Sequence, residues 1–252
     1  MESLIRGNLI QRKAISCIKF LGCCIFLSCS KSEVKPVTTF NFPSPIIGKT
    51  YTADEIIAFK QLSINSATNY KIVKLPPNVS FYLKDTAYAY LTLELDLIIR
   101  KLNMLDSNLT FSRTTDSLAS TIKVYFRDRE SYIRQEPATA PTLQNSSYTG
   151  YGYINWNSNG QIYHGSAFVD MVRTMGDTLF QRHVIHHEIM HTLGFLGHTS
   201  LPQFHTIIFK YTLTPLILDY TSFDKRMIQL LYNPAIKANM DEAKFNEAVK
   251  NL

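Results

Sequence analysis

Residues 187–198 read HEIMHTLGFLGH, and this stretch indicates more about fold and chemistry than any other part of the chain. In an α-helix, side chains four positions apart lie on one face, so His187 and His191 can reach the same metal ion. The helical period rotates Glu188 by about 100° from His187. Its carboxylate is therefore expected beside the ion, as a proton acceptor and not as a ligand. The stretch predicts a helix that carries a metal site.

The residues after this pair supply a candidate third ligand. Gly194 is suited to the left-handed conformation that ends a helix and turns the chain back. His198 follows that turn, and three protein ligands with a fourth position open are typical of catalytic zinc sites. All seven histidines fall within residues 164–205, which is not the distribution of scattered core histidines. The alternative is an amphipathic helix with a hydrated histidine face.

The composition is that of a globular protein with enough material for one core. The chain has 252 residues, of which 45% are hydrophobic and 12% aromatic, and no repeat or low-complexity tract is visible. These values predict one folded domain with at most a small appendage.

The first 28 residues have the pattern of a secretory signal peptide. Four basic residues precede the short apolar run at residues 20–27, which is too short to anchor stably across a bilayer. The sequence ending at Cys29 resembles a bacterial lipoprotein signal, with Cys29 as the residue that becomes lipidated; Cys24 is the weaker alternative. All four cysteines lie at or before Cys29, so the mature chain can form no internal disulfide. A plain signal peptide or a membrane anchor remains the other interpretation.

Charge and composition define the remaining parts of the chain. Removal of residues 1–28 takes away three net positive charges and lowers the formal charge from +6 to +3. No basic stripe is left that would favour nucleic-acid binding. Residues 29–47 are polar and contain prolines, as expected for a tether, and residues 48–252 are expected to form the domain.

Hydrophobic patterning in residues 48–252 predicts an α+β fold. Helices are expected at residues 52–61, 85–105, from Asp177 through the histidine motif, and 221–232. Strands are expected at residues 70–75, 79–83, 109–111, 122–126, 151–156 and 161–171. The last two strands flank an Asn-Gly pair at Asn159 and Gly160, which favours a hairpin.

This order of elements resembles the zincin fold, and the spacing His187-Glu188…His191…Gly194…His198 more narrowly resembles the metzincins. The resemblance implies a twisted mixed sheet, an active-site helix and a small C-terminal subdomain. It also implies an antiparallel edge strand beside the cleft, expected within residues 165–171, to which a peptide substrate adds as a further strand. Residues 223–234 are similar to the closing helix of matrixin-like bacterial proteins and of a related family of uncharacterised secreted proteins.

Two features depart from the metzincin pattern. The third metzincin ligand follows the second histidine by six residues, where this chain has Gly197. His198 comes one residue later and is our choice of third ligand, with His205 and Asp219 as the alternatives.

The second departure concerns the methionine turn that lies beneath the metal in metzincins. Residues 204–211 occupy its place but contain no methionine, so Ile208 or Phe209 would supply the apolar floor. Tyr211 or Tyr220 is a candidate for assisting at the metal or the transition state, although packing is the more common role of a tyrosine.

Several further residues have two interpretations. His183 and His186 lie on other faces of the helix and are expected to be structural, and His164 is a lesser candidate for the cleft. Aromatic residues around the hairpin could line a substrate groove or pack the hairpin; they are Tyr148, Tyr151, Tyr153 and Trp156.

The resemblance implies a zinc-dependent endopeptidase in which Glu188 acts as general base. We expect Zn²⁺ as cofactor, a peptide or protein as substrate, and a monomer held by the lipid on Cys29 at the bacterial cell envelope, on the outer membrane or cell surface. One alternative is a non-catalytic zincin-fold surface lipoprotein that binds a protein or a glycan. Another is a zinc hydrolase that acts on something other than peptide.

Overall fold

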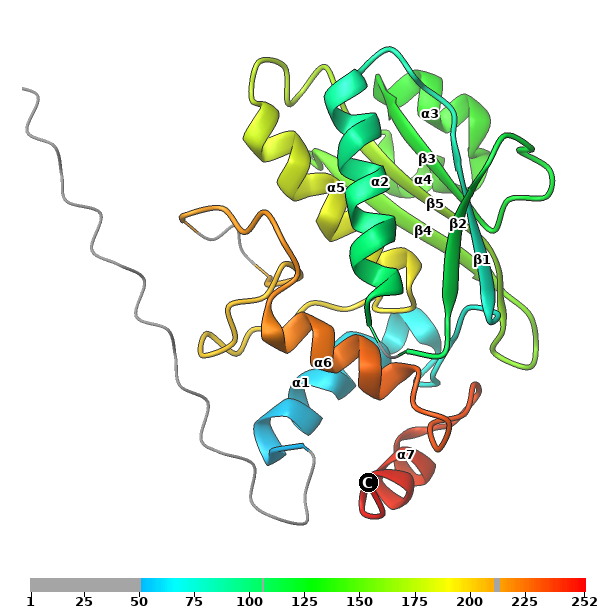
Figure 1. Ribbon diagram of the computed structural model, residues 1–252, viewed down its shortest axis with the longest axis vertical. Coiled ribbons are helices and arrows are strands. Elements are labelled where there is room, and N and C mark those ends of the chain that lie inside the picture. The colour runs from blue at the N-terminus through cyan, green and yellow to red at the C-terminus, as the bar shows by residue number, and fades with distance from the viewer. Residues whose placement is uncertain (1–50, 106, 211–213) are drawn as a thin grey trace, which may run out of the picture. The chain divides into compact units, whose positions relative to one another are not determined.

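A five-stranded mixed sheet forms the centre of the computed structural model, as the predicted α+β class requires (Figure 1). The strand order is β2-β1-β3-β5-β4. The strands are β1 (Asn78–Leu83), β2 (Thr110–Thr114), β3 (Ile122–Arg127), β4 (Gly150–Trp156) and β5 (Ile162–Asp170). Strands β1, β2, β3 and β5 run parallel to one another, whereas β4 pairs antiparallel with β5 and lies at one edge.

The structure describes residues 51–105, 107–210 and 214–252, and all of them fall within one unit of the chain. The expected signal peptide at residues 1–28, the lipidation site Cys29 and the tether at residues 29–47 lie outside the described residues, as does Tyr211. No helix among the described residues is both long and apolar enough to cross a bilayer.

Helices lie on both faces of the sheet and beside one end of it. They are α1 (Ala53–Ser63), α2 (Ala89–Asn103), α3 (Arg129–Gln135), α4 (Ala140–Leu143), α5 (Thr178–Thr192), α6 (Ser222–Leu231) and α7 (Glu242–Val249), with 3₁₀ turns at Ser66–Thr68 and Pro137–Thr139. Helices α2 and α5 cover one face and bury the main core, while α3 and α4 lie on the other (Figure 1). Helices α1, α6 and α7 gather at one end of the sheet (Figure 1).

Side-chain caps start three of the helices where the sequence predicts helix starts. Thr52 and Glu55 form a capping box at the start of α1. The Asp177 side chain accepts a hydrogen bond from the backbone of Phe180 and caps α5. A second capping box starts α6. These local signals explain why the starts of α1, α5 and α6 were predicted correctly.

The predicted hairpin is present, but the predicted position of the edge strand is wrong. Strands β4 and β5 pair through the turn at residues 157–160, in which Gly160 has a φ of 74°. The edge strand is β4, and not a segment within residues 165–171, because β5 also pairs parallel with β3 along its other side. A strand with neighbours on both sides cannot offer a free edge to substrate.

The prediction of a strand at residues 70–75 is also wrong. Asn69 and Tyr70 have positive φ values of 52° and 56°, so the chain enters this segment through a tight turn. Its backbone donors go to scattered partners: Ile72 N–H donates to the Met240 carbonyl and Lys74 N–H to the Gly160 carbonyl. A continuous ladder therefore does not form, and only single bridges occur.

Three helices, α3, α4 and α7, were not predicted, and α2 is shorter than predicted. Asp128 caps α3 and Asp241 caps α7, and an aspartate before the first helical turn is the sequence signal for both helix starts. Helix α2 begins at Ala89 and not at Asp85. The Asp85 carboxylate instead accepts from the Phe126 backbone and from the side chain of Arg127 at 2.8 Å.

Candidate metal centre

Helix α5 and the turn after it carry the candidate site. The helix runs beneath β4 and β5 and is buried along most of its length. It ends at Thr192 with Leu193 as its C-cap, and Gly194 follows with a φ of 108°. A Cβ at this glycine would lie 2.6 Å from the Val73 carbonyl oxygen, so glycine is required both for conformation and for space. The turn sends the chain back toward the helix, as the sequence predicted.

The structure brings the three predicted ligands together. The Nε2 atom of His187 lies 3.0 Å from that of His198 and 3.1 Å from that of His191. Within residues 51–105, 107–210 and 214–252, these three side chains form the one group of at least three His, Cys, Asp or Glu residues spaced to hold a metal ion. Nitrogens bound tetrahedrally about 2.0–2.1 Å from zinc lie roughly 3.3 Å apart, so the donor set fits this ion.

Hydrogen bonds to backbone carbonyls fix the tautomer of two ligands. His187 Nδ1 donates to the Ile207 carbonyl at 2.8 Å, and His191 Nδ1 donates to the Phe195 carbonyl. We assign the protons to Nδ1 because a carbonyl oxygen can only accept. The Nε2 atoms of His187 and His191 then carry no proton, and their lone pairs face each other and repel. A cation between them would turn this repulsion into attraction, which is the second sign that the site suits a metal.

Burial keeps these imidazoles neutral. Desolvation, followed by the neighbouring His198, lowers the pKa of His191 to about 4. Desolvation also holds the pKa of His187 well below its usual value, with the His191 and His198 rings adding to the effect. Neutral imidazole is the form that binds metals, so the ligands are ready to coordinate at physiological pH.

Glu188 lies beside the triad in a buried position. Desolvation raises the pKa of its carboxyl group well above the usual value, and a hydrogen bond from the Gly152 backbone opposes the shift. A raised pKa makes a carboxylate a stronger proton acceptor, while a nearby cation would favour its ionised form. The environment therefore suits a general base next to a metal.

Two adjoining cavities meet at the triad. One has a volume of about 290 Å³ and is lined on its far side by Phe180, His183 and Phe209. The other has a volume of about 480 Å³ and extends along β4 to Trp156. Both cavities are bordered by a shared set of residues, Tyr148, Gly150, His187, Glu188 and His198. The triad and Glu188 thus lie at the middle of a groove.

Two glycines of β4 allow the strand to lie directly against α5. A Cβ at Gly150 would lie 2.6 Å from the Glu188 carboxylate, and one at Gly152 would lie 2.4 Å from His191 Cβ. Neither distance is tolerated by real side chains, so only glycine permits this approach. Sequence reasoning missed both residues, although alternating glycines in a strand are a known sign of close backbone contact.

Asp224 supports the carbonyl that His187 contacts. Its buried carboxylate accepts from the Ile207 backbone N–H at 3.3 Å and from the hydroxyl of Thr206. The same carboxylate accepts from the backbone and hydroxyl of Thr221 at the start of α6, both at 2.8 Å. The segment expected to replace the methionine turn is therefore tied to α6. Sequence reasoning assigned Asp224 only to a helix start.

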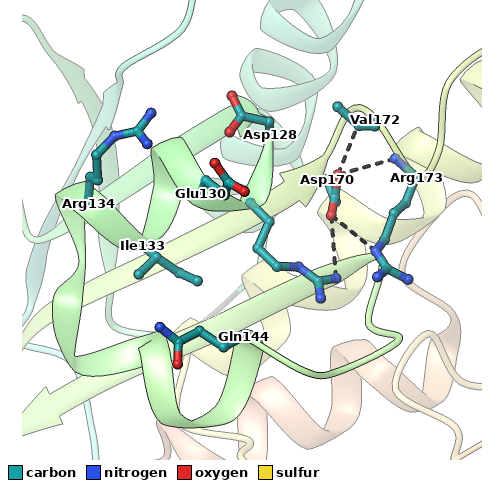
Figure 2. Close-up of a pocket in the computed structure, with 9 residues that line it drawn as sticks. Asp128, Glu130, Ile133, Arg134, Gln144, Asp170, Val172 and Arg173 are labelled. Atoms are coloured by element: carbon teal, nitrogen blue, oxygen red, sulfur yellow. Dashed lines mark hydrogen bonds and ion pairs between the residues drawn. The ribbon is translucent and has the colours of Figure 1, made fainter.

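Arg129 holds the loop that forms one wall of the groove. Its guanidinium donates to the carbonyls of Leu143, Ser146 and Tyr148. It also lies 3.4 Å from the carboxylate of Asp170, which accepts from the backbone of Val172 and Arg173. Figure 2 shows Asp170 beside Val172 and Arg173, in the lining of a separate cavity of about 730 Å³ that none of the three histidines borders.

The other histidines lie elsewhere or have structural partners. His164 points to the sheet face away from α5, where its Nε2 is 3.0 Å from the Glu136 carboxylate, so the structure does not bring it to the triad. His186 is fully buried against Glu94 at 2.7 Å. His183 Nδ1 donates to the Ile217 carbonyl, and its ring borders the smaller cavity.

Neither alternative third ligand belongs to the metal-spaced group, and Tyr220 faces another side of α5. Asp219 pairs with Lys101 at 2.9 Å, and His205 is exposed and outside the metal-spaced group. Tyr220 is buried with its ring edge-on to His186, on a different face of α5 from the ligands. In the expected apolar floor, Ile208 is fully buried and Phe209 lines the smaller cavity.

A family model described as a protein of unknown function, DUF2927, matches residues 55–251. The chain belongs to the DUF2927 family. The matched region runs from α1 to α7 and includes the whole sheet, the triad and Glu188. A comparison with curated proteins found no match. The family description names no activity, so the function of this DUF2927 domain has to be inferred from its own side chains and their geometry.

Proposed function

We propose that this DUF2927 protein is a zinc-dependent endopeptidase with a zincin-type, metzincin-like domain. The observation that carries the proposal is the convergence of three Nε2 atoms beside a buried carboxylate, at the centre of a groove. An antiparallel edge strand next to the motif helix supports the fold assignment. A site built only for structure would not need a buried carboxylate without an ion-pair partner next to its ligands.

His187, His191 and His198 would hold the zinc ion. Zinc bound there would polarise a substrate carbonyl and bring the pKa of a coordinated water toward neutrality. Glu188 accepts the proton of the attacking water and then delivers it to the leaving amine. Gly152 orients the Glu188 carboxyl through its backbone N–H. His187 and His191 keep their Nε2 lone pairs directed into the site through their bonds to backbone carbonyls.

The groove along β4 supports a peptide as substrate. The outer edge of β4 has no strand partner among the described residues, and the larger cavity follows it from Gly150 to Trp156. An extended peptide can hydrogen-bond to such an edge as an added strand. Its scissile bond would then pass over Glu188, with side chains on either side directed into the two cavities.

Zinc content and peptidase activity of the same samples test this proposal. We expect one zinc per purified chain and cleavage of a general peptide substrate. Glu188→Gln should keep the zinc and lose at least about 100-fold in kcat, because a general base contributes roughly 10²–10⁴. His198→Ala should lose most of the bound zinc and serves as the ligand control.

Two results would contradict the proposal. A wild-type protein that takes up no zinc after reconstitution would exclude the zinc-peptidase function and favour a zincin-shaped binding protein. A zinc-loaded protein that keeps its hydrolytic rate in Glu188→Gln would show that another group accepts the proton.

A further inference from the structure

The loop that carries His198 is attached to the C-terminal end of α1. The backbone N–H of Gly197 donates to the Leu62 carbonyl at 2.9 Å. A Cβ at Gly197 would lie 2.0 Å from the Gln61 carbonyl oxygen and 2.6 Å from the Asn65 amide nitrogen. The loop therefore lies against the α1 backbone at a distance that only glycine permits. This contact also accounts for the absence of histidine at position 197.

The side chain of Gln61 attaches the loop on the other side of His198. Its Oε1 accepts from the Thr199 hydroxyl at 3.0 Å and from the Ser200 backbone N–H at 3.4 Å. Thr199 is fully buried. The residues immediately before and after His198 are thus both hydrogen-bonded to consecutive residues of α1.

His198 depends on these backbone contacts more than the other two ligands do. His187 and His191 each have a carbonyl that accepts from Nδ1, whereas His198 has no such partner among the described residues and is exposed. It also sits on a loop and not on the helix. Its imidazole contacts the rings of His187 and His191, but no backbone carbonyl among the described residues accepts from its Nδ1, so the path of its own backbone decides where the ring lies.

We propose that α1 is a positioning element of the metal centre, and that Gln61 is the side chain through which it places the third ligand. The inference rests on the proposed zinc site and assigns a role to a helix more than 100 residues away in sequence. Gln61 makes no contact with the metal. It acts by holding Thr199 and Ser200, so that His198 completes the coordination.

A matched pair of variants tests this role. Gln61→Leu removes the acceptor at nearly the same volume, whereas Gln61→Glu keeps an oxygen for the Thr199 and Ser200 donors. Zinc dissociation constants would be measured by competition with a chromophoric chelator, with the thermal midpoint of unfolding followed in parallel. Loss of a group that orients a ligand costs roughly 10–100-fold in affinity. We expect at least about 10-fold weaker zinc binding in Gln61→Leu and near-wild-type affinity in Gln61→Glu.

A double-mutant cycle separates positioning from general stability. In a His198→Ala background there is no third imidazole to place, so Gln61→Leu should weaken zinc binding no further. Cobalt substitution gives an independent reading, since loss of one nitrogen ligand alters the visible absorption of Co²⁺. Ile57→Ala, at an exposed position of the same helix, is the control and should leave affinity unchanged.

The outcomes distinguish the inference from the proposed function. Wild-type protein that binds no zinc overturns both. Tight zinc binding with the same affinity in Gln61→Leu overturns only the positioning role of α1. An equal loss of affinity in the wild-type and His198→Ala backgrounds also overturns it, because the effect would then not pass through His198.

Discussion

At the scale of single residues, the site depends on glycines that have no Cβ as much as on the side chains that line it. Gly152 faces α5, and its absent Cβ leaves room for the His191 side chain and the Glu188 backbone. Gly165 lies on the neighbouring strand β5 and also faces α5, but a Cβ there would make ordinary contacts at 3.4–3.5 Å. The two positions differ in the space available to one methyl group.

We expect Gly152→Ala to destabilise the protein and disturb the metal site. Its Cβ would lie 2.4 Å from His191 Cβ and 2.8 Å from the Glu188 carbonyl oxygen, so strand and helix must separate. Overpacking of this kind costs about 1–3 kcal/mol. Urea unfolding would measure the loss, and zinc affinity should fall with it. Gly165→Ala is the control; an equal loss in both variants would contradict the steric argument.

At the scale of elements, the N-terminal cap of α6 is linked to the segment that contacts His187. Asp224 accepts from four donors, two at the start of α6 and two in the segment that contacts His187. Desolvation nevertheless raises the pKa of this carboxyl group from 3.8 to about 6, with the hydrogen bonds opposing the shift. The native state therefore holds the Asp224 proton more tightly than the unfolded chain does.

This raised pKa predicts a pH-dependent contribution to stability. Between about pH 4 and 6 the native state binds more protons at Asp224, so this contribution is full below pH 4 and is lost as the pH rises through 6. In chelator-treated protein, the free energy of unfolding of wild type minus that of Asp224→Asn should be larger at pH 4.5 than at pH 7.5, by roughly 2 kcal/mol. A difference that is constant, or that grows with pH, would contradict the assignment.

At the scale of the whole molecule, the first and last helices of the described chain, α1 and α7, pack against each other near the histidine triad. Phe59 of α1 stacks on Phe245 of α7 with ring centroids 4.7 Å apart. The Phe59 ring also contacts the ring of Phe195 edge-on. Phe195 is also the residue whose carbonyl accepts from His191. The last helix thus supports the first, and the first supports the loop that carries His198.

Removal of this aromatic contact should lower the free energy of unfolding considerably, even though α7 is the last helix of the chain. Phe245 is fully buried, so Phe245→Ala should lower the free energy of unfolding by about 3 kcal/mol. The nearby pair Lys60–Glu242 is partly exposed, and Glu242→Gln should cost less than about 1 kcal/mol. Denaturant titrations of both variants would check this order; a larger loss in Glu242→Gln would contradict it.

Local chemistry in the sequence was enough to predict the starts of α1, α5 and α6, the hairpin and the three histidines that converge. Caps such as Asp177, the Asn-Gly turn and the His187–His191 spacing act over a few residues, so their consequences follow from the chain itself. Gly194 belongs to the same class, since its left-handed turn is a property of one residue.

Only the tertiary structure decided which strand lies at the edge and what holds the ligands in place. The free edge belongs to β4 because β5 pairs with β3, which is a contact between segments distant in sequence. The supports of the triad are likewise long-range: Gln61 for the loop of His198, and Asp224 for the carbonyl beside His187. Hydrogen bonds and packing between such segments depend on how the chain folds back on itself, and no local pattern encodes them.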